Sequence, residues 1–300
     1  MKKILMAALV ALPALAVGGS AVADTIPFPA VHSGNVFVIA HTVTTDGVMS
    51  DYFAPGGTVV FRSYAVDAKT RKVLTAKDVT YFYVKIPNQP NVKLTYNPTA
   101  PGATTRLAWI GVWTVPSNYT TGIVDYKVLV QAKSKRRGQF VPLPVASSVL
   151  TVVSTPPTVP TGTAPGVGPG PGSTLDVSLY VDSVNGTRPV GAPARPVGCT
   201  QTNVYRRGEQ FVLRAWGTEM ATGAVLSTDN VKDAHFSIPG QPDVTLNWGL
   251  HGTAPNKVYF WTNFWNIPAD FPLGEVTVHV VFDLESGKTG TYDHLITIIP

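Results

Sequence analysis

The side chains that could do chemistry are sparse in this chain, and two histidines lead them. His235 and His279 occur in separate segments that alternate apolar and polar residues, and Asp233 lies two positions before His235. Imidazole and carboxylate groups together are common metal ligands. If the two segments are neighbouring strands, His235, His279 and Asp233 share one outer face and form a metal site. No H-x-H, H-x-x-H or Cys/His spacing supports that interpretation, and the alternative is that all three are solvated surface groups.

A run of cations is the second candidate for binding chemistry. Four basic residues fall within one short stretch: Lys133, Lys135, Arg136 and Arg137. They are predicted to form a hairpin tip, where they could contact an acidic partner, a lipid phosphate or an anionic polysaccharide. The corresponding segment of the second half, residues 285–290, lacks this charge. A solvated loop tip is the simpler alternative.

Familiar catalytic motifs are missing from the sequence. It has no G-x-S-x-G, no H-E-x-x-H, no P-loop, no C-x-x-C-H and no G-x-G-x-x-G between a strand and a helix. Acidic residues fall mostly in turns or on predicted outer faces. We therefore expect a protein that is not an enzyme and that uses no cofactor.

An internal repeat decides the architecture that must position these residues. Residues 56–131 align without a gap on residues 208–283, and 19 of the 76 pairs are identical. Chance would supply about five identities at ordinary residue usage. The chain is therefore one module built twice.

Two tryptophan pairs belong to this repeat: Trp109 with Trp113, and Trp261 with Trp265. Each pair falls on one face of a predicted strand. Flat aromatic faces can stack on sugars or on proline-rich peptides. Both pairs persist in the two copies while the outward residues diverge, and that persistence favours a place in the core.

The first residues predict export. Lys2 and Lys3 precede an apolar run over 4–17, and Ala21 to Ala23 fit the small-residue cleavage pattern of a signal peptide. The run is too short to span a bilayer, and no later stretch is long enough. We expect residues 1–23 to be a cleaved bacterial signal peptide and the protein to be periplasmic or secreted, with an uncleaved anchor as the alternative.

Charge is divided unevenly between the halves. Residues 24–153 carry 13 basic and 6 acidic residues, a net of +7, whereas residues 174–300 carry 8 and 12, a net of −4. Opposite fields could steer the halves toward different partners or toward each other, although drift of solvated faces gives the same counts. An exported protein with one acidic half is a poor candidate for nucleic-acid binding.

A spacer separates the halves. Residues 154–173 contain six Pro, five Gly and no charge, a composition that buries nothing. We expect an immunoglobulin-like domain at 24–153, a semi-extended Pro/Gly-rich linker at 154–173 and a second such domain at 174–300. The two domains are then independent, unless their faces dock.

Seven short strands are predicted in each domain, separated by Gly, Pro, Asn and Asp turns, and no helix follows the signal. The predicted strands of the first domain are 36–43, 58–66, 79–86, 91–96, 105–115, 123–132 and 147–153. Those of the second are 175–184, 210–218, 231–238, 243–248, 257–267, 275–283 and 294–299. Seven strands in a module of this size predict an antiparallel β-sandwich.

Several short patterns carry a resemblance. A Tyr or Phe and then a Gly precede a strand that ends in Arg (Arg62 and Arg214), and Trp-x-x-Pro leads into a Gly and the next strand in each copy. These patterns resemble bacterial immunoglobulin-like modules of macroglobulin and related surface proteins, over about 120 residues of each half. The resemblance implies an all-β fold of two tandem antiparallel sandwiches, and it says little about function.

Strand alternation assigns the outer faces. Tyr81, Tyr83 and Lys127 are predicted to form one outer patch of the first domain. In the immunoglobulin topology their two strands lie side by side, and so do the strands that carry His235 and His279. These patches are the surfaces on which we expect binding.

Cys199 is the sole cysteine, so an exported chain has no internal disulfide. Its thiol is either a buried small hydrophobe or an exposed group that can link to another molecule. Taken together, we expect an exported, non-catalytic binding or scaffold protein that docks onto a protein partner in the cell envelope or the extracellular space. A carbohydrate- or metal-binding accessory protein is the alternative.

Overall fold

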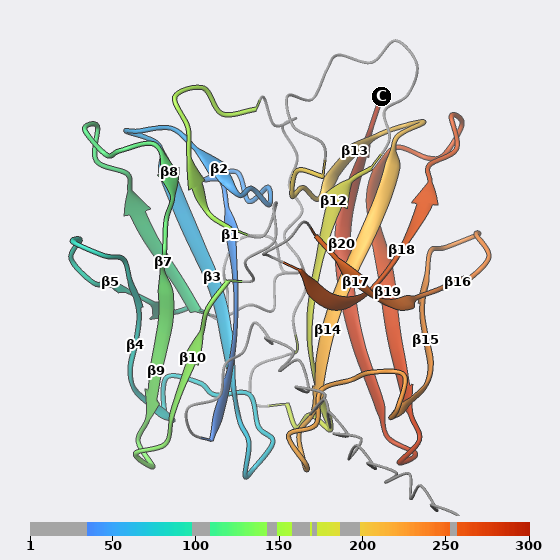
Figure 1. Ribbon diagram of the computed structural model, residues 1–300, viewed down its shortest axis with the longest axis horizontal. Coiled ribbons are helices and arrows are strands. Elements are labelled where there is room, and N and C mark those ends of the chain that lie inside the picture. The colour runs from blue at the N-terminus through green and yellow to red at the C-terminus, as the bar shows by residue number, and fades with distance from the viewer. Residues whose placement is uncertain are drawn as a thin grey trace, which may run out of the picture.

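The computed structural model describes residues 35–97, 109–142, 149–157, 169, 173–186, 199–252 and 257–300. These residues form two antiparallel β-sandwiches side by side, without a helix (Figure 1). The predicted fold class, two tandem immunoglobulin-like sandwiches, is confirmed. The predicted signal peptide, most of the linker and residues 187–198 lie outside the described residues. We call residues 35–157 module 1 and residues 173–300 module 2.

Module 1 has two main sheets and a small one within its described residues. Their strand orders are β1-β3-β7-β6, β10-β9-β4-β5 and β2-β11-β8. The strands are β1 (Val36–Val43), β2 (Tyr52–Phe53), β3 (Thr58–Asp67), β4 (Val79–Lys85), β5 (Val92–Lys93), β6 (Thr95–Tyr96), β7 (Trp109–Thr114), β8 (Gly122–Ile123), β9 (Lys127–Ala132), β10 (Arg137–Phe140) and β11 (Thr151–Val152).

Module 2 repeats this plan with two sheets, in the orders β12-β14-β18-β17 and β13-β20-β19-β15-β16. The strands are β12 (Val177–Asn185), β13 (Val204–Arg206), β14 (Gln210–Glu219), β15 (Val231–Ser237), β16 (Val244–Thr245), β17 (Asn247–His251), β18 (Val258–Asn266), β19 (Gly274–Leu284) and β20 (Thr289–Ile299). In both modules a short strand pairs in parallel with the last one, β2 with β11 and β13 with β20.

Most long strands begin and end close to their predicted bounds, but β20 begins at Thr289 instead of the predicted 294, and the predicted strand 123–132 is divided into β8 and β9. The predicted strands 91–96 and 243–248 each divide, because the chain crosses from one sheet to the other at the buried Leu94 and Leu246. β2, β10 and β13 were not predicted, since each is short. Residues 105–108 and 147–148 of predicted strands lie outside the described residues.

Alternating side chains fill each sandwich separately. Module 2 closes around its own cluster, with Phe211, Phe236 and Phe282 fully buried, and module 1 has a core of the same kind. All four tryptophans of the two pairs are buried, each 8% exposed or less. The prediction that these pairs belong to the core is therefore confirmed.

Equivalent glycines close one side of each sandwich. A Cβ on Gly138 of β10 would lie 2.0 Å from the carbonyl oxygen of Val36 in β1. A Cβ on Gly290 of β20 would lie 2.6 Å from the side chain of Val177 in β12. Glycine is needed at both places because the backbones of the two sheets approach so closely.

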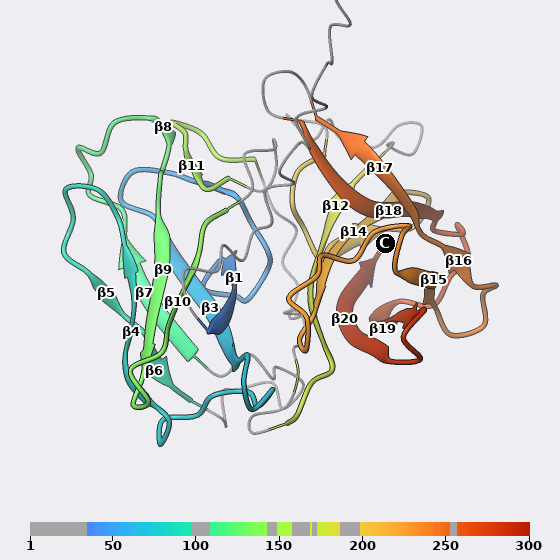
Figure 2. The same cartoon turned by 60° about the horizontal axis from the view of Figure 1, so that its bottom comes forward.

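The modules dock against each other. Figures 1 and 2 show β1 and β3 of module 1 beside β12 and β14 of module 2. Tyr180, Trp216 and Phe260 point outward from module 2 and pack into the hydrophobic cluster of module 1. The outer faces of the sheets β1-β3-β7-β6 and β12-β14-β18-β17 thus cover each other in part.

Polar contacts fix this docking. The Tyr64 hydroxyl donates to the carbonyl of Leu179 at 2.7 Å, and the Met49 amide donates to Oδ1 of Asn203 at 2.9 Å. Arg71 forms an ion pair with Asp176. The sequence left open whether the two domains are independent or docked, and the structure places them in contact.

Candidate functional site

The outer face of the sheet β10-β9-β4-β5 carries the first candidate surface. Strand register sets its rows: Tyr81 lies opposite Gln131 and then Arg137, and Tyr83 lies between Leu129 and Lys93. Lys85 and Lys127 face each other in the next row. We call six residues of this surface the Tyr–Lys face: Tyr81, Tyr83, Lys85, Lys93, Lys127 and Arg137.

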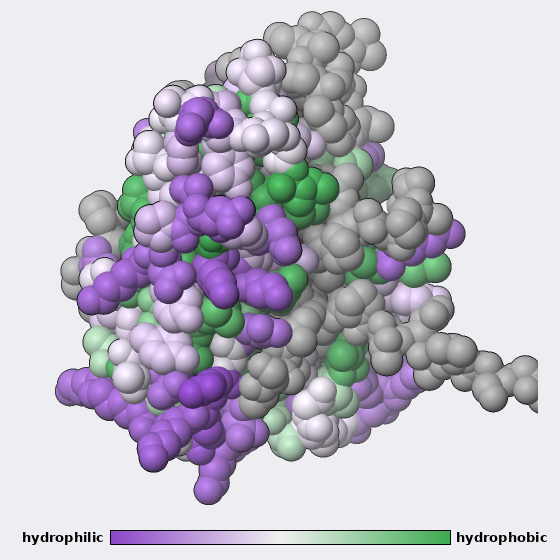
Figure 3. All heavy atoms as spheres, turned by 60° about the vertical axis from the view of Figure 1, so that its left-hand side comes forward, coloured by the Kyte–Doolittle hydropathy of each residue, from purple (hydrophilic) through white to green (hydrophobic). Residues whose placement is uncertain are grey.

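The two tyrosines of this face lie next to each other, between the cations. The rings of Tyr81 and Tyr83 have centroids 5.3 Å apart, and Tyr81 is 37% exposed. The predicted patch of Tyr81, Tyr83 and Lys127 therefore lies on one surface. Among the described residues of these strands no acid points outward beside them. Hydrophilic side chains gather on the side of module 1 that faces away from module 2 (Figure 3).

The hairpin between β9 and β10 does not hold its four cations as one cluster. Lys133 and Lys135 are exposed at the tip, and Arg137 lies on the sheet, where its Nε donates to Gln131 at 3.0 Å. Arg136 turns inward and forms an ion pair with the buried Asp67. The expectation of four free cations is wrong for Arg136, because a buried carboxylate takes its charge.

The corresponding surface of module 2 carries the predicted histidines. His235 pairs with Asp233 of its own strand, with Nδ1 2.6 Å from the carboxylate. His279 makes the same contact with Asp293 of β20, also at 2.6 Å. His279 lies opposite Ser237 rather than His235 in the register, so the histidines occupy separate rows. In the part of the chain that the structure describes, no group of three or more His, Cys, Asp or Glu could hold a metal.

This surface carries acids on strands whose counterparts in module 1, β4, β9 and β10, carry none. Asp233 occupies the position of Tyr81, and Asp283 that of Gln131, in the repeat of 152 residues. His279 stands where module 1 has Lys127. We call six of its residues the acidic face: Asp233, His235, Glu275, His279, Asp283 and Asp293. Lys232 borders it at a bulge in β15.

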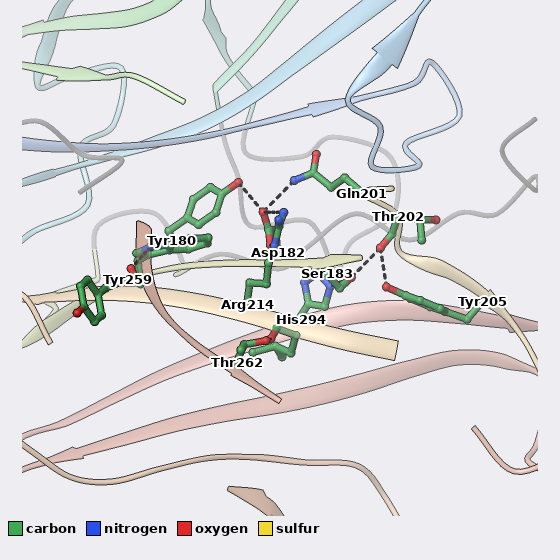
Figure 4. A network of polar contacts seen from close by, with 12 residues as sticks. Tyr180, Asp182, Ser183, Gln201, Thr202, Tyr205, Arg214, Tyr259, Thr262 and His294 are labelled. Carbon is green, nitrogen blue, oxygen red and sulfur yellow. Dashed lines mark hydrogen bonds and ion pairs between the residues drawn. The ribbon is translucent and has the colours of Figure 1, made fainter. Parts of the chain in front are cut away.

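A buried polar network lies between the modules. Three residues converge on the carboxylate of Asp182 (Figure 4). Arg214 donates twice at 2.7 Å, and Tyr180 and Gln201 each donate at 3.1 Å. Burial alone would lower the pKa of Arg214, but the Asp182 carboxylate reverses this and raises it. The Arg214 guanidinium is therefore charged, and the ion pair is closed to solvent.

Two buried side chains of module 1, His41 and Asp51, lie near this network without hydrogen-bond partners among the described residues. His41 stacks on the ring of Tyr180, with centroids 4.7 Å apart, and neither of its nitrogens has a hydrogen-bond partner among the described residues. Burial first, and then Arg62, lower the pKa of His41 to about 3, so the imidazole is neutral. Burial also raises the pKa of Asp51 to about 7, although Arg214 acts in the opposite direction.

A serine and a histidine are adjacent below this network, and their geometry argues against catalysis. Ser183 Oγ donates to the carbonyl of Thr202 at 2.6 Å and lies 2.8 Å from Nε2 of His294. Because the hydroxyl proton is already committed, the histidine donates to the serine and cannot act as its base. Both side chains are fully buried. Burial lowers the pKa of His294 to about 3, which keeps its ring neutral.

Cys199 is exposed. The interpretation of Cys199 as a buried hydrophobe is therefore wrong, and the thiol can meet another molecule. Its backbone φ of 58° is uncommon for a residue with a side chain. In the described part of the chain, no helix is long and apolar enough to cross a membrane.

Comparison with known proteins gives no family. No protein-family model matches the sequence, and neither does any curated protein. Among solved structures the chain is similar to the fibronectin(III)-like modules of CbhA from Clostridium thermocellum. That similarity has 13% identity, a TM-score of 0.22 and coverage of 87% of this chain and 94% of the other.

Two further solved structures are similar at the same low level. One is SGBP-B of the Bacteroides ovatus mixed-linkage glucan utilization locus, in complex with a heptasaccharide (14% identity, TM-score 0.19, 83% of this chain and 43% of that one). The other is the C-terminal domain of the AgI/II polypeptide BspA from Streptococcus agalactiae (7% identity, TM-score 0.18, 87% and 99%). The fold assignment made here therefore depends on strand order and pairing.

Sequence reasoning missed Lys85 and Lys93 on the Tyr–Lys face. Lys85 shares the strand parity of Tyr81 and Tyr83 and was assigned outward, but its pairing with Lys127 needed the register. The network around Asp182 gave no signal either, because a lone Asp in an apolar strand shows its partner only after the sheet has formed. The only member of the network that the sequence singled out was Arg214, because it is identical to Arg62 in the repeat.

Proposed function

We propose that this chain is an exported, non-catalytic binding protein, periplasmic or secreted, whose Tyr–Lys face docks onto an acidic protein partner. The observation that carries the proposal is the surface of two tyrosines and four cations on one sheet, with the uncharged Leu129 and Gln131 among them. Tyrosines supply large contact area at a low cost in conformational entropy, which suits protein interfaces.

The cations of the face indicate that the partner is acidic. Lys85 and Lys127 face each other directly, a pairing of like charges that is unfavourable in the isolated sheet. An acidic surface that covers them relieves this repulsion. Long-range attraction also steers such a partner toward the face and speeds association.

A role in binding rather than catalysis also fits the buried polar groups. Asp182, Arg214, Ser183 and His294 are closed to solvent between or within the modules. A substrate that reached them would have to separate the modules. We assign this network to holding the modules together.

Titration with an acidic peptide tests the proposal. The purified chain is titrated with a fluorescent decapeptide of Asp and Glu at low salt, and the affinity is measured by anisotropy. Lys85→Glu/Lys127→Glu should lower the affinity at least tenfold. The matched control, Lys69→Glu/Lys77→Glu, changes net charge equally at exposed turns outside the face and should leave the affinity within twofold.

Two results would overturn the proposal. One is equal binding by the face variant and the wild type, and the other is an equal loss in the control, which would mean that net charge alone attracts the peptide. Binding of a neutral glucan oligosaccharide that depends on Tyr81 and Tyr83 but not on salt would replace the protein partner with a carbohydrate.

A further inference from the structure

The two outer faces of this molecule complement each other. On corresponding sheets of the repeat, the Tyr–Lys face of module 1 is basic and the acidic face of module 2 is acidic, with the charges at different positions. The first holds four cations, with the exposed Asp125 two residues before Lys127 at its border. The second holds four carboxylates, with Lys232 at its border.

The location of the two faces prevents them from meeting within one molecule. The sheets β1-β3-β7-β6 and β12-β14-β18-β17 point toward the other module. The Tyr–Lys face and the acidic face lie on the remaining sheets, at opposite ends of the molecule (Figures 1 and 2). Any pairing between these faces is therefore between copies.

We infer that the acidic partner of the Tyr–Lys face is the acidic face of a second copy of this chain. This inference rests on the proposed function, because it names the partner of the same surface. Each copy offers one Tyr–Lys face and one acidic face, so the contact joins two different surfaces and is heterologous. Such contacts continue from copy to copy and produce head-to-tail chains or closed rings.

The two surfaces are built alike. Both are outer faces of twisted antiparallel sheets built on the same repeat, without a described loop rising from their centres. Leu129 in module 1 and Val281 in module 2 hold equivalent central positions, and both are half-buried. An apolar centre ringed by opposite charges is the usual anatomy of an interface.

Electrostatic attraction across such a contact depends on salt. The carboxylates of Asp233 and Asp293 are 47% and 37% exposed, so solvent screens them in the free molecule. The Debye length is about 10 Å at 0.1 M salt and about 3 Å at 1 M. Association between copies should therefore be strong at low ionic strength and weak at high ionic strength.

A charge-exchange experiment tests this inference. Variant A is Lys85→Glu/Lys127→Glu, which makes both ends of the molecule acidic. Variant B is Asp233→Lys/Asp293→Lys, which makes both ends basic. Sedimentation equilibrium should show wild-type mass rising with concentration at 20 mM salt and falling to the monomer at 0.5 M. Variants A and B should each stay monomeric alone and should associate when mixed in equal amounts.

A control variant and the preceding titration separate the outcomes. Lys69→Glu/Lys77→Glu lies outside both faces and should associate as the wild type does. A wild type that stays monomeric at 200 µM and low salt, while it still binds the acidic peptide, overturns the second copy as partner and leaves the proposed function standing. Association that persists in both variants alone, or fails to return in their mixture, also overturns the inference. Loss of peptide binding in the wild type overturns both proposals.

Discussion

Asp51 is a carboxyl group that the docked modules hold in an unfavourable place. Its side chain is 1% exposed, and neither oxygen has a hydrogen-bond partner of normal geometry among the described residues. Burial raises its pKa to about 7; the backbone amides of Asp51 and Gln201 and the charge of Arg214 act in the opposite direction, and Asp182 raises the pKa further. We predict that Asp51→Asn stabilises the protein at alkaline pH and does so less at acidic pH.

The magnitude follows from proton linkage. The unfolded pKa is 3.8 and the folded one about 7. A raised folded pKa contributes stability that is complete below the unfolded value and is lost as the pH rises through the folded value. The full effect is about 4 kcal/mol at about 1.4 kcal/mol per pKa unit. Between pH 5 and pH 8 the variant should gain about 2.5 kcal/mol relative to the wild type.

Urea unfolding followed by tryptophan fluorescence at pH 5, 6.5 and 8 measures this difference. His41 and His294, with pKa values lowered to about 3, stabilise the fold above pH 6.5 and lose that contribution as the pH falls, equally in both proteins. The exposed Asp46→Asn is the control and should show no pH-dependent difference. A gap between Asp51→Asn and the wild type that is the same at pH 5 and pH 8 would refute the reasoning.

Three further predictions concern the packing. Arg214→Met leaves the buried Asp182 carboxylate without its cation and should cost about 3–5 kcal/mol of unfolding free energy, measured by urea titration; a cost under about 1 kcal/mol would contradict the charged pair. Acrylamide should quench the tryptophan emission weakly, because Trp109, Trp113, Trp216, Trp261 and Trp265 are buried, and strong quenching would contradict the core. Gly138→Ala should destabilise the protein more than Gly290→Ala, because the added Cβ meets backbone at Gly138 and a side chain at Gly290. Thermal unfolding should show overpacking costs of about 1–3 kcal/mol or more. The reverse order would show that β1 and β10 separate easily at Gly138.

Much of the fold could be predicted because the repeat and the alternation carry it. Val276, Val278, Val280 and Phe282 occupy alternate positions of one strand and so share one face, and all are buried. The strands of Tyr83 and Lys127 were expected to be neighbours, and the register pairs them. Period-two patterns determine a face, so these predictions needed no knowledge of distant contacts.

The contact between the modules could not be predicted in the same way. Residues such as Tyr180 and Trp216 read as ordinary strand aromatics, and only the assembled sheets show that they point outward into the other module. Arg136 is similar, since its position in a basic run hides a partner 69 residues away in the sequence. Alternation assigns a face, but the surface that covers the face depends on tertiary structure.

The docked arrangement has a mechanical consequence. Tyr64, Met49 and Arg71 connect module 1 directly to module 2, so these contacts must break before the modules can turn against each other. While the contacts hold, groups on the two modules keep one spacing and one orientation. A force that pulls the modules apart would act on the packed rings of Tyr180, Trp216 and Phe260.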